Sequence, residues 1–236
     1  MSIELRNVSL RTRGTINPLS LQDINIRVGP RDRVAFLCPR AGLSALLNVI
    51  AGAASPDTGR VIRHGSLSWP IPGGSFLHKH QSFIANARFI ARLYEVDQAS
   101  FIAKVVELAR VEDISEERLG RCPKEAVGRF SFALGACLQF DTYLLTAVKI
   151  GDKRDTERYA GVIADLARNS GLLVAASAGK GLQDFCDEAY VFDRGRAHHY
   201  KDVEAATEHM ARIAKPTDAD EEDAWPAEEE RLLDDF

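Results

Sequence analysis

Apolar and polar residues alternate along two stretches near the start of the chain, residues 3–10 and 21–28. This period of two predicts two half-buried β-strands. A continuous apolar run at 33–38 indicates a buried strand, and residues 44–53 have the spacing of a helix. Further strands are predicted at 60–68, 142–150, 172–177 and 189–192, a loop at 69–76, and helices at 83–94, 99–110, 115–120, 124–138, 155–169, 181–187 and 203–213. Because strands alternate with helices, we expect an α/β fold with a mainly parallel sheet, preceded by a smaller antiparallel sheet.

The length and composition suit one α/β domain. The chain has 236 residues, of which 45% are hydrophobic and 27% charged. It has no apolar run of the roughly 18–20 residues that a membrane-spanning helix needs, and its first residues do not resemble a signal peptide. The cysteines are scattered without metal-binding spacing, so we expect reduced thiols, no metal site and a cytoplasmic protein; they are Cys38, Cys122, Cys137 and Cys186.

The charge is distributed unevenly. Residues 216–236 contain ten acidic residues and one basic residue, Arg231, for a net charge of −9. Subtracting them from the totals of 34 acidic and 30 basic residues leaves 24 and 29, or +5 for the rest of the chain. Such an acidic block is usually a solvated, disordered tail. The alternative is a tail that folds back on the basic body or binds a partner.

Residues 34–47, VAFLCPRAGLSALL, occupy the place of a phosphate-binding loop between a strand and a helix. A working loop reads G-x-x-x-x-G-K-[ST], in which backbone amides cradle the phosphates and the lysine reaches the outer two. Here Cys38 replaces the first glycine, Leu43 replaces the lysine, and the segment is one residue short. We therefore expect no bound cofactor, and at most weak binding of ATP and magnesium, at the degenerate loop Cys38, Pro39, Arg40, Ala41, Gly42, Leu43, Ser44 and Ala45.

Four strings of residues resemble the ATPase subunits of ABC transporters, and more narrowly those of capsular polysaccharide exporters. They are VIAGAASPDTGRVIRHGSLSWP at 49–70, NARFIARLYEVD at 86–97, FDTYLL at 140–145 and FCDEAYVFDRGR at 185–196. The resemblance implies an ABC-type P-loop NTPase fold over residues 1–213, with an antiparallel β subdomain and a helical subdomain at about 82–138. Residues 214–236 would form the acidic tail.

The residues that act in this family are replaced in this chain. The resemblance places Thr12 where an aromatic residue stacks on adenine, and Thr146 and Ala147 where two acids hold magnesium and activate water. It places Ser177 at the position of the family histidine. Without these groups neither the metal nor a general base is positioned, so we expect no catalytic residue.

The motif that ABC subunits lend to their partner also differs. Lys124 and Glu125 stand at its serine and glycine positions, and a carboxylate there would repel a triphosphate. Gly151 and Asp152 match a contact between the two subunits of a family dimer. Asn86, Arg88 and the loop at 69–76 lie where the family meets its membrane subunit.

The leading hypothesis is an inactive homologue of a polysaccharide-export ATPase with an auxiliary or regulatory role. Its partners would be the exporter's membrane subunit, an intact ATPase paralogue, or both, as a homodimer or heterodimer at the inner face of the cytoplasmic membrane. One alternative is an ordinary ATP-hydrolysing exporter subunit. The other is an interaction protein unrelated to transport. None of these hypotheses involves nucleic acid.

Overall fold

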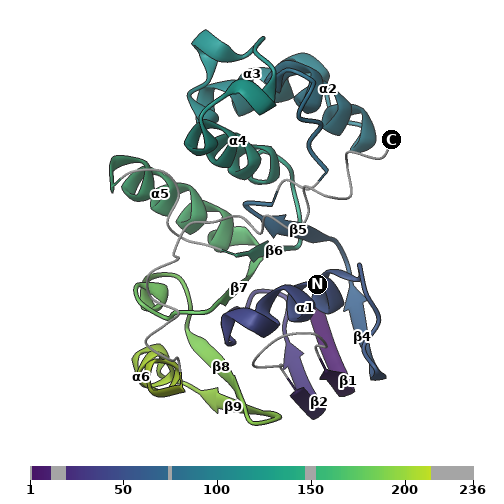
Figure 1. Ribbon diagram of the computed structural model, residues 1–236, viewed down its shortest axis with the longest axis vertical. Coiled ribbons are helices and arrows are strands. Elements are labelled where there is room, and N and C mark those ends of the chain that lie inside the picture. Colours follow the sequence, from purple (N-terminus) through teal and green to yellow (C-terminus); the bar gives the residue numbers. More distant parts are fainter. Residues whose placement is uncertain (1, 12–19, 74–75, 147–152, 214–236) are drawn as a thin grey trace.

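The computed structural model of the chain describes residues 2–11, 20–73, 76–146 and 153–213 (Figure 1). Our predictions for Thr12, Ala147, Gly151, Asp152 and the acidic segment 214–236 lie outside these residues. None of the helices in the described ranges is both long and apolar enough to cross a membrane.

Two sheets form the lower part of the molecule in Figure 1. The first is antiparallel, in the order β2-β1-β4, and contains β1 (Ser2–Arg11), β2 (Ser20–Val28) and β4 (Thr58–His64). The second has the order β5-β6-β7-β3-β8-β9, in which only the last pair is antiparallel. Its strands are β3 (Arg33–Leu37), β5 (Leu67–Ile71), β6 (Thr142–Leu145), β7 (Gly171–Ala176), β8 (Glu188–Asp193) and β9 (Arg196–Tyr200). The α/β fold with a mainly parallel sheet and an antiparallel subsheet is confirmed.

Strand β3 explains why the fold has two hydrophobic cores. Successive side chains of a strand point to opposite faces of a sheet. Val34 and Phe36 belong to the core shared with the antiparallel sheet and α1, whereas Ala35 and Leu37 belong to the core beneath the other helices. The central strands are therefore buried on both faces, which accounts for their continuous apolar sequences.

The helices are α1 (Arg40–Ala51), α2 (Phe83–Leu93), α3 (Gln98–Ala109), α4 (Lys124–Ala136), α5 (Lys153–Asn169) and α6 (Val203–Ile213). Helices α2, α3 and α4 lie together beyond β5, at the top of Figure 1. The side chains of Ser82 and Asp97 accept hydrogen bonds from the first turns of α2 and α3, so capping fixes where these helices begin.

Several expected elements differ from those observed. The helix expected at 44–53 begins at Arg40, and the strand expected at 60–68 is divided into β4 and β5 at Gly65, whose φ of 97° favours glycine. β5 also extends into the expected loop at 69–76. The helices expected at 115–120 and 181–187 reduce to short 3₁₀ turns at Glu112–Ile114, Leu119–Arg121 and Leu182–Asp184. β9 was not expected.

Candidate functional site at the carboxyl ends of the parallel strands

Three of the predicted site positions lie at one edge of the parallel sheet. β3 and β7 pair up to Leu37 and Ala176, and β6 pairs with β7 up to Leu145. Cys38, Ser177 and Thr146 follow directly after these ends. In open α/β sheets, ligands bind in the crevice outside the carboxyl ends of the strands. The fold therefore brings together the positions at which the sequence placed the degenerate loop and two of the replaced catalytic groups.

The connection from β3 to α1 consists of only two residues, Cys38 and Pro39. The amide of Cys38 donates to the carbonyl of Ala176 at 3.0 Å, and the amide of Gly42 donates to the carbonyl of Pro39 at 2.8 Å. Pro39 itself has no N–H. An anion nest needs successive amides that point toward the ligand. Three of the five backbone positions from Cys38 to Gly42 thus offer no such amide.

Two side chains of this segment turn toward the core. Leu43 packs, partly buried, against the core of the antiparallel sheet, and Cys38 is fully buried in the same core. Burial raises the pKa of the Cys38 thiol to about 12. At neutral pH the thiol is protonated and unreactive, so Cys38 contributes packing. In the same segment Arg40, Ala41 and Ser44 are exposed, and Ala45 is half-buried.

Thr146 is held by the neighbouring strand. Its amide donates to the carbonyl of Ile71 at 2.7 Å, and its hydroxyl lies 3.3 Å from the carbonyl oxygens of both Ile71 and Pro72. Hydrogen bonds of this kind tie the end of β6 to the end of β5. Ser177 is half-buried in the bend that follows β7.

Lys124 and Glu125 lie elsewhere, in the first turn of α4, after Pro123. Both are exposed. Figure 1 shows α4 grouped with α2 and α3, away from α1. Glu125 near the helix N-terminus is favoured by the helix dipole, which gives this residue a structural reason to be acidic.

The outer face of α2 carries apolar side chains that the sequence analysis did not single out. Phe89 and Leu93 are 58% and 63% exposed, whereas Phe83 and Ile90 on the opposite face are buried. The signal was present, since Phe89 and Leu93 are spaced i, i+4 and so share one side of the helix. Beside this pair, Tyr94 is 39% exposed.

An aromatic cluster adjoins the same helix. The ring of Trp69 lies 5.0 Å from that of Phe76 and 5.8 Å from those of Tyr94 and Phe140, measured between centroids. Asn86, by contrast, is buried and uses its side-chain amide to bond the backbone of His78 and Ser82. We infer that Asn86 shapes the segment before α2 and that the exposed contacts come from its neighbours.

A hollow of about 910 Å³ lies at the other end of the strands, where α3, α4 and α5 meet the amino ends of β6 and β7. Lys104, Glu107, Arg158 and Asp165 give its wall both signs of charge. No group of three or more His, Cys, Asp or Glu side chains in the described ranges is arranged to hold a metal ion.

The chain shares its fold with solved ABC ATPase structures. A solved structure described as the ATP-binding subunit of an ABC transporter superimposes with a TM-score of 0.74, covering 92% of this chain and 97% of that one at 16% identity. The chain therefore has the fold of an ABC ATPase. No protein-family model matches the chain.

The sequence narrows the resemblance to polysaccharide export. The chain is 26% identical over 197 residues to the ATP-binding protein BexA of Haemophilus influenzae, covering 83% of this chain and 91% of BexA. It is 29% identical over 178 residues to the polysialic acid transport ATP-binding protein KpsT of Escherichia coli, covering 72% of this chain and 78% of KpsT. It is 26% identical over 191 residues to the capsule polysaccharide export ATP-binding protein CtrD of Neisseria meningitidis, covering 80% of this chain and 88% of CtrD. The predicted resemblance to capsular polysaccharide export ATP-binding proteins is thus confirmed.

Proposed function

We propose that this chain is a non-hydrolysing ABC-type subunit that serves capsular or cell-surface polysaccharide export as an auxiliary or regulatory component. It works at the inner face of the cytoplasmic membrane. It binds the exporter's membrane subunit, an intact ATPase paralogue, or both. The fold and the relatives support the link to export.

The observation that carries the loss of hydrolysis is the two-residue connection between β3 and α1. With Cys38 and Gly42 donating their amides within the chain, and Pro39 lacking one, the connection has little left to bind a phosphate. Leu43 brings an apolar side chain where a lysine would offset the phosphate charge. Mg-ATP loses its two main sources of affinity at this edge.

Thr146 and Ser177 support the same proposal. Neither a threonine hydroxyl held by Ile71 and Pro72 nor a serine hydroxyl supplies the carboxylate or imidazole that phosphoryl transfer needs to position water. Glu125 at the start of α4 likewise places a carboxylate where the helix would meet a triphosphate bound to a second subunit. The chain would therefore not complete the ATP site of a partner.

The outer face of α2 supports the partner role. Phe89 and Leu93 leave apolar area in water, and exposed apolar groups that gather on one face commonly mark protein interaction sites. This face lies in the region that, by the resemblance, meets the membrane subunit.

Mg-ATP titration of the purified full-length protein tests the proposal. A ligand at 100 times its dissociation constant stabilises the folded state by about 2.7 kcal/mol, so tight binding would raise the melting temperature by several degrees. We expect no rise at millimolar Mg-ATP and no phosphate release above the buffer blank. An exporter ATPase with an intact phosphate loop, assayed in parallel, should show both.

The relatives favour a second candidate, an ordinary ATP-binding subunit of a polysaccharide exporter, because their printed names describe ATP-binding proteins. That function requires hydrolysis at about 1 per second or faster, together with a thermal shift. Hydrolysis would overturn the non-hydrolysing role, and a thermal shift alone would overturn the loss of ATP binding. Both results would leave the link to export in place.

A further inference from the structure

The net charge of residues 1–215 is +5, and all of it comes from the first 68 residues. Residues 1–68 contain nine arginines, no lysine and four acidic residues, for a net charge of +5. Residues 69–215 contain 20 basic and 20 acidic residues, so they add nothing. The antiparallel sheet lies within these 68 residues, and its three strands contain five arginines and two acidic residues, so the sheet attracts anions.

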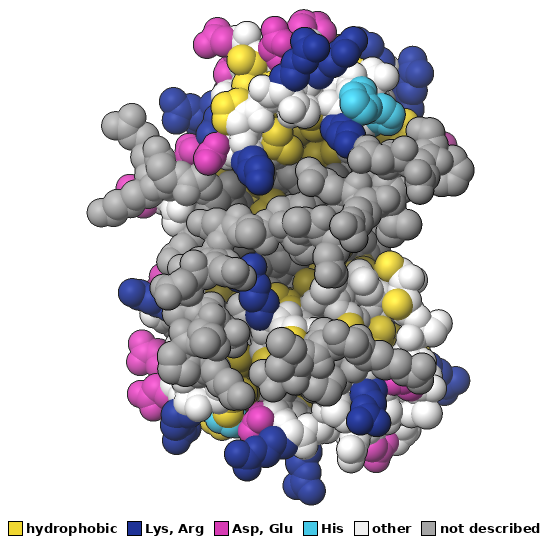
Figure 2. Space-filling model, in the orientation of Figure 1, with side chains coloured by type: hydrophobic (Ala, Val, Ile, Leu, Met, Phe, Trp, Pro, Cys, Tyr) yellow, Lys and Arg dark blue, Asp and Glu magenta, His cyan; other side chains and the backbone are white. Residues whose placement is uncertain are grey.

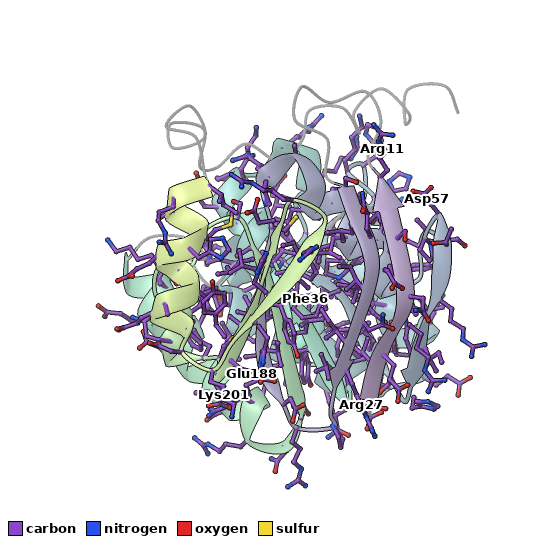
Figure 3. All side chains as sticks on the ribbon, turned by 90° about the horizontal axis from the view of Figure 1, so that it is seen from below. Arg11, Arg27, Phe36, Asp57, Glu188 and Lys201 are labelled. Carbon is purple, nitrogen blue, oxygen red and sulfur yellow. The ribbon has the colours of Figure 1, made fainter. Side chains whose placement is uncertain are left out.

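The solvent-facing side of this sheet gathers the arginines. Arg6, Arg27 and Arg60 are exposed, whereas Ile3, Leu5 and Ile26 on the inner side are buried. We call these three residues, one from each strand, the arginine face. Figure 3 shows Arg27 at one end of the sheet and Arg11 at the other. Between the strands, Glu4, Leu5, Arg6, Asn25, Ile26 and Arg27 line a shallow hollow of about 260 Å³.

The arginine face contains more cations than the sheet neutralises. Arg6 and Arg60 are direct partners across β1 and β4, and like charges in this position destabilise a sheet. Glu4 serves two guanidinium groups, with its carboxylate 2.9 Å from Nε of Arg6 and 3.7 Å from Nε of Arg27. The hydrogen bond from Arg6 lowers the pKa of Glu4, so this carboxyl group is ionised and already engaged. Among the described residues, Arg60 has no ion pair.

Two other acids of the sheet region already have hydrogen-bond partners. Asp23 accepts a hydrogen bond from the side chain of Asn7, and Asp57 accepts one from the amide of Arg11. Figure 3 shows Asp57 beside Arg11, away from Arg27. The like-charged pair of Arg6 and Arg60 therefore has a physical reason to persist if an anionic group from outside the sheet covers it.

We propose that the acidic segment 216–236 of the same chain docks on the arginine face. It carries the complementary charge of −9 and contains Trp225 and Phe236 as apolar points. The described chain ends at Ile213, in α6, and α6 packs against β8 and β9. Gly195, between those strands, accepts a hydrogen bond from the amide of Gln22 at 2.9 Å, so β2 is the neighbouring strand.

The length of the chain allows this contact. An extended chain spans about 3.3 Å per residue, so the residues after Ile213 reach about 75 Å. The docked segment neutralises Arg6 and Arg60 and keeps other anions from the sheet. The contact is electrostatic, and it weakens as salt shortens the screening length from about 10 Å at 0.1 M to about 3 Å at 1 M.

Digestion of the full-length protein by a glutamate-specific protease tests the docking, because the segment contains five Glu residues between 221 and 230. Intact-mass measurements follow the loss of the segment. The test variant is the double charge reversal R6E/R60E. The matched control is R92E/R118E, which changes the charge equally at two exposed arginines of the helical region that have no described ion pair.

At low salt we expect the R6E/R60E variant to lose the segment roughly five times faster than the wild type, because cleavage tracks the undocked population. The control should behave like the wild type, and 1 M salt should remove the difference. Melting curves must first show that both variants are folded. Tenfold dilution should leave the wild-type rate unchanged, as expected of a contact within one chain.

Three outcomes would overturn the proposal. Equal rates in the wild type and R6E/R60E would mean that the segment does not bind this face. Equal acceleration in both variants would mean a general attraction to net charge. Protection that disappears on dilution would mean binding to a second copy. None of these readouts depends on ATP, so they are independent of the function proposed above.

Discussion

At the carboxyl ends of β3, β6 and β7 the candidate site residues are buried or hydrogen-bonded within the chain, whereas on the outer face of α2 apolar side chains lie open to solvent. Cys38 is buried, Leu43 is packed and Thr146 bonds to the end of β5. Phe89 and Leu93 are more than half exposed. Folding stability favours the first arrangement and gains nothing from the second.

This difference indicates which of the two regions is prepared to bind a ligand or partner. A site that binds phosphate must leave amides and charge unsatisfied until the ligand arrives, and the edge beside Cys38 has bonded two of its amides already. An interface keeps apolar area uncovered until its partner arrives. Figure 2 shows hydrophobic side chains (yellow) open to solvent among Lys and Arg side chains at the top of the molecule, where Figure 1 places α2, α3 and α4.

The largest effect on stability is expected from the ion pairs that join α5 to α3 and α4. Asp155 of α5 is 6% exposed and lies 3.5 Å from Arg129 of α4 and 3.7 Å from Arg110, while Arg129 also donates to the carbonyl of Ala109 at 2.9 Å. Asp155→Ala removes the buried carboxylate and leaves two partly exposed arginines without it, so the free energy of unfolding should fall by about 2–3 kcal/mol. Urea unfolding followed by circular dichroism measures this value.

The control for these ion pairs is Asp165→Ala on the same helix, α5. Asp165 pairs with Arg168 at the surface, where both side chains are more than 60% exposed. Such a pair contributes less than about 1 kcal/mol. If the two substitutions lower the free energy of unfolding equally, the ion pairs of Asp155 do not hold α3 and α4 to α5.

The next effect is a pH dependence of stability that we expect to be stronger for Cys38 than for Cys122. Burial raises the pKa of Cys38 to about 12, whereas an unfolded thiol ionises near its ordinary pKa of about 8.5. The unfolded state therefore loses its proton first as pH rises. The stability due to this group is complete below pH ~8.5 and is lost by about 1.4 kcal/mol per pH unit up to the folded pKa.

Comparing variants between pH 8 and 10.5 checks this slope. Cys38→Ala should flatten the decline in the free energy of unfolding by about 1.4 kcal/mol per pH unit above pH 9, relative to Cys122→Ala. Cys122 is only half-buried, so an alkylating reagent should modify it in the native protein and leave Cys38 intact. Rapid native-state modification of Cys38 would show that the edge beside β3 opens.

A smaller effect is expected from restoring the lysine of the phosphate loop. Leu43→Lys replaces a partly buried apolar side chain and should cost about 1 kcal/mol of stability. We expect neither ATP hydrolysis nor a thermal shift with Mg-ATP, because the amides of Cys38 and Gly42 remain bonded within the chain. Leu43→Met, which conserves volume, is the control for packing. A thermal shift in the lysine variant alone would mean that the connection can rearrange into an anion nest.

Local patterns predicted most of the fold. The apolar run at 33–38 became β3, and the last helix was predicted with both of its ends correct, Val203–Ile213. The helix expected at 44–53 was placed four residues too late because Arg40, Ala41 and Gly42 were interpreted as part of a loop. In the structure they form the first turn of α1 after Pro39. Periodicity does not reveal where a polar first turn begins.

The candidate site was predictable as a set of positions but not as a set of contacts. The resemblance located Cys38, Thr146 and Ser177, yet the bond from Cys38 to Ala176 depends on how β3 and β7 pair. The exposure of Phe89 depends on which face of α2 packs against the core. Phe83 and Ile90 occupy that core, so the face with Phe89 is left exposed. These contacts join residues far apart in sequence, so no local pattern contains them.

The smallest effect on stability falls on the outer face of α2. Phe89→Asp places a charge on a side chain that is already 58% exposed, so the free energy of unfolding should change by less than about 0.5 kcal/mol. Binding should respond differently, because an apolar contact in the centre of an interface is replaced by an unpaired charge. We expect co-purification with the membrane subunit of a polysaccharide exporter to fall at least about tenfold, equivalent to 1.4 kcal/mol.

Arg212→Asp, at an exposed position of α6, should leave co-purification unchanged. Equal recovery of the Phe89→Asp and wild-type proteins would assign the membrane subunit to another surface, and the contrast between the two regions would then lose its functional meaning.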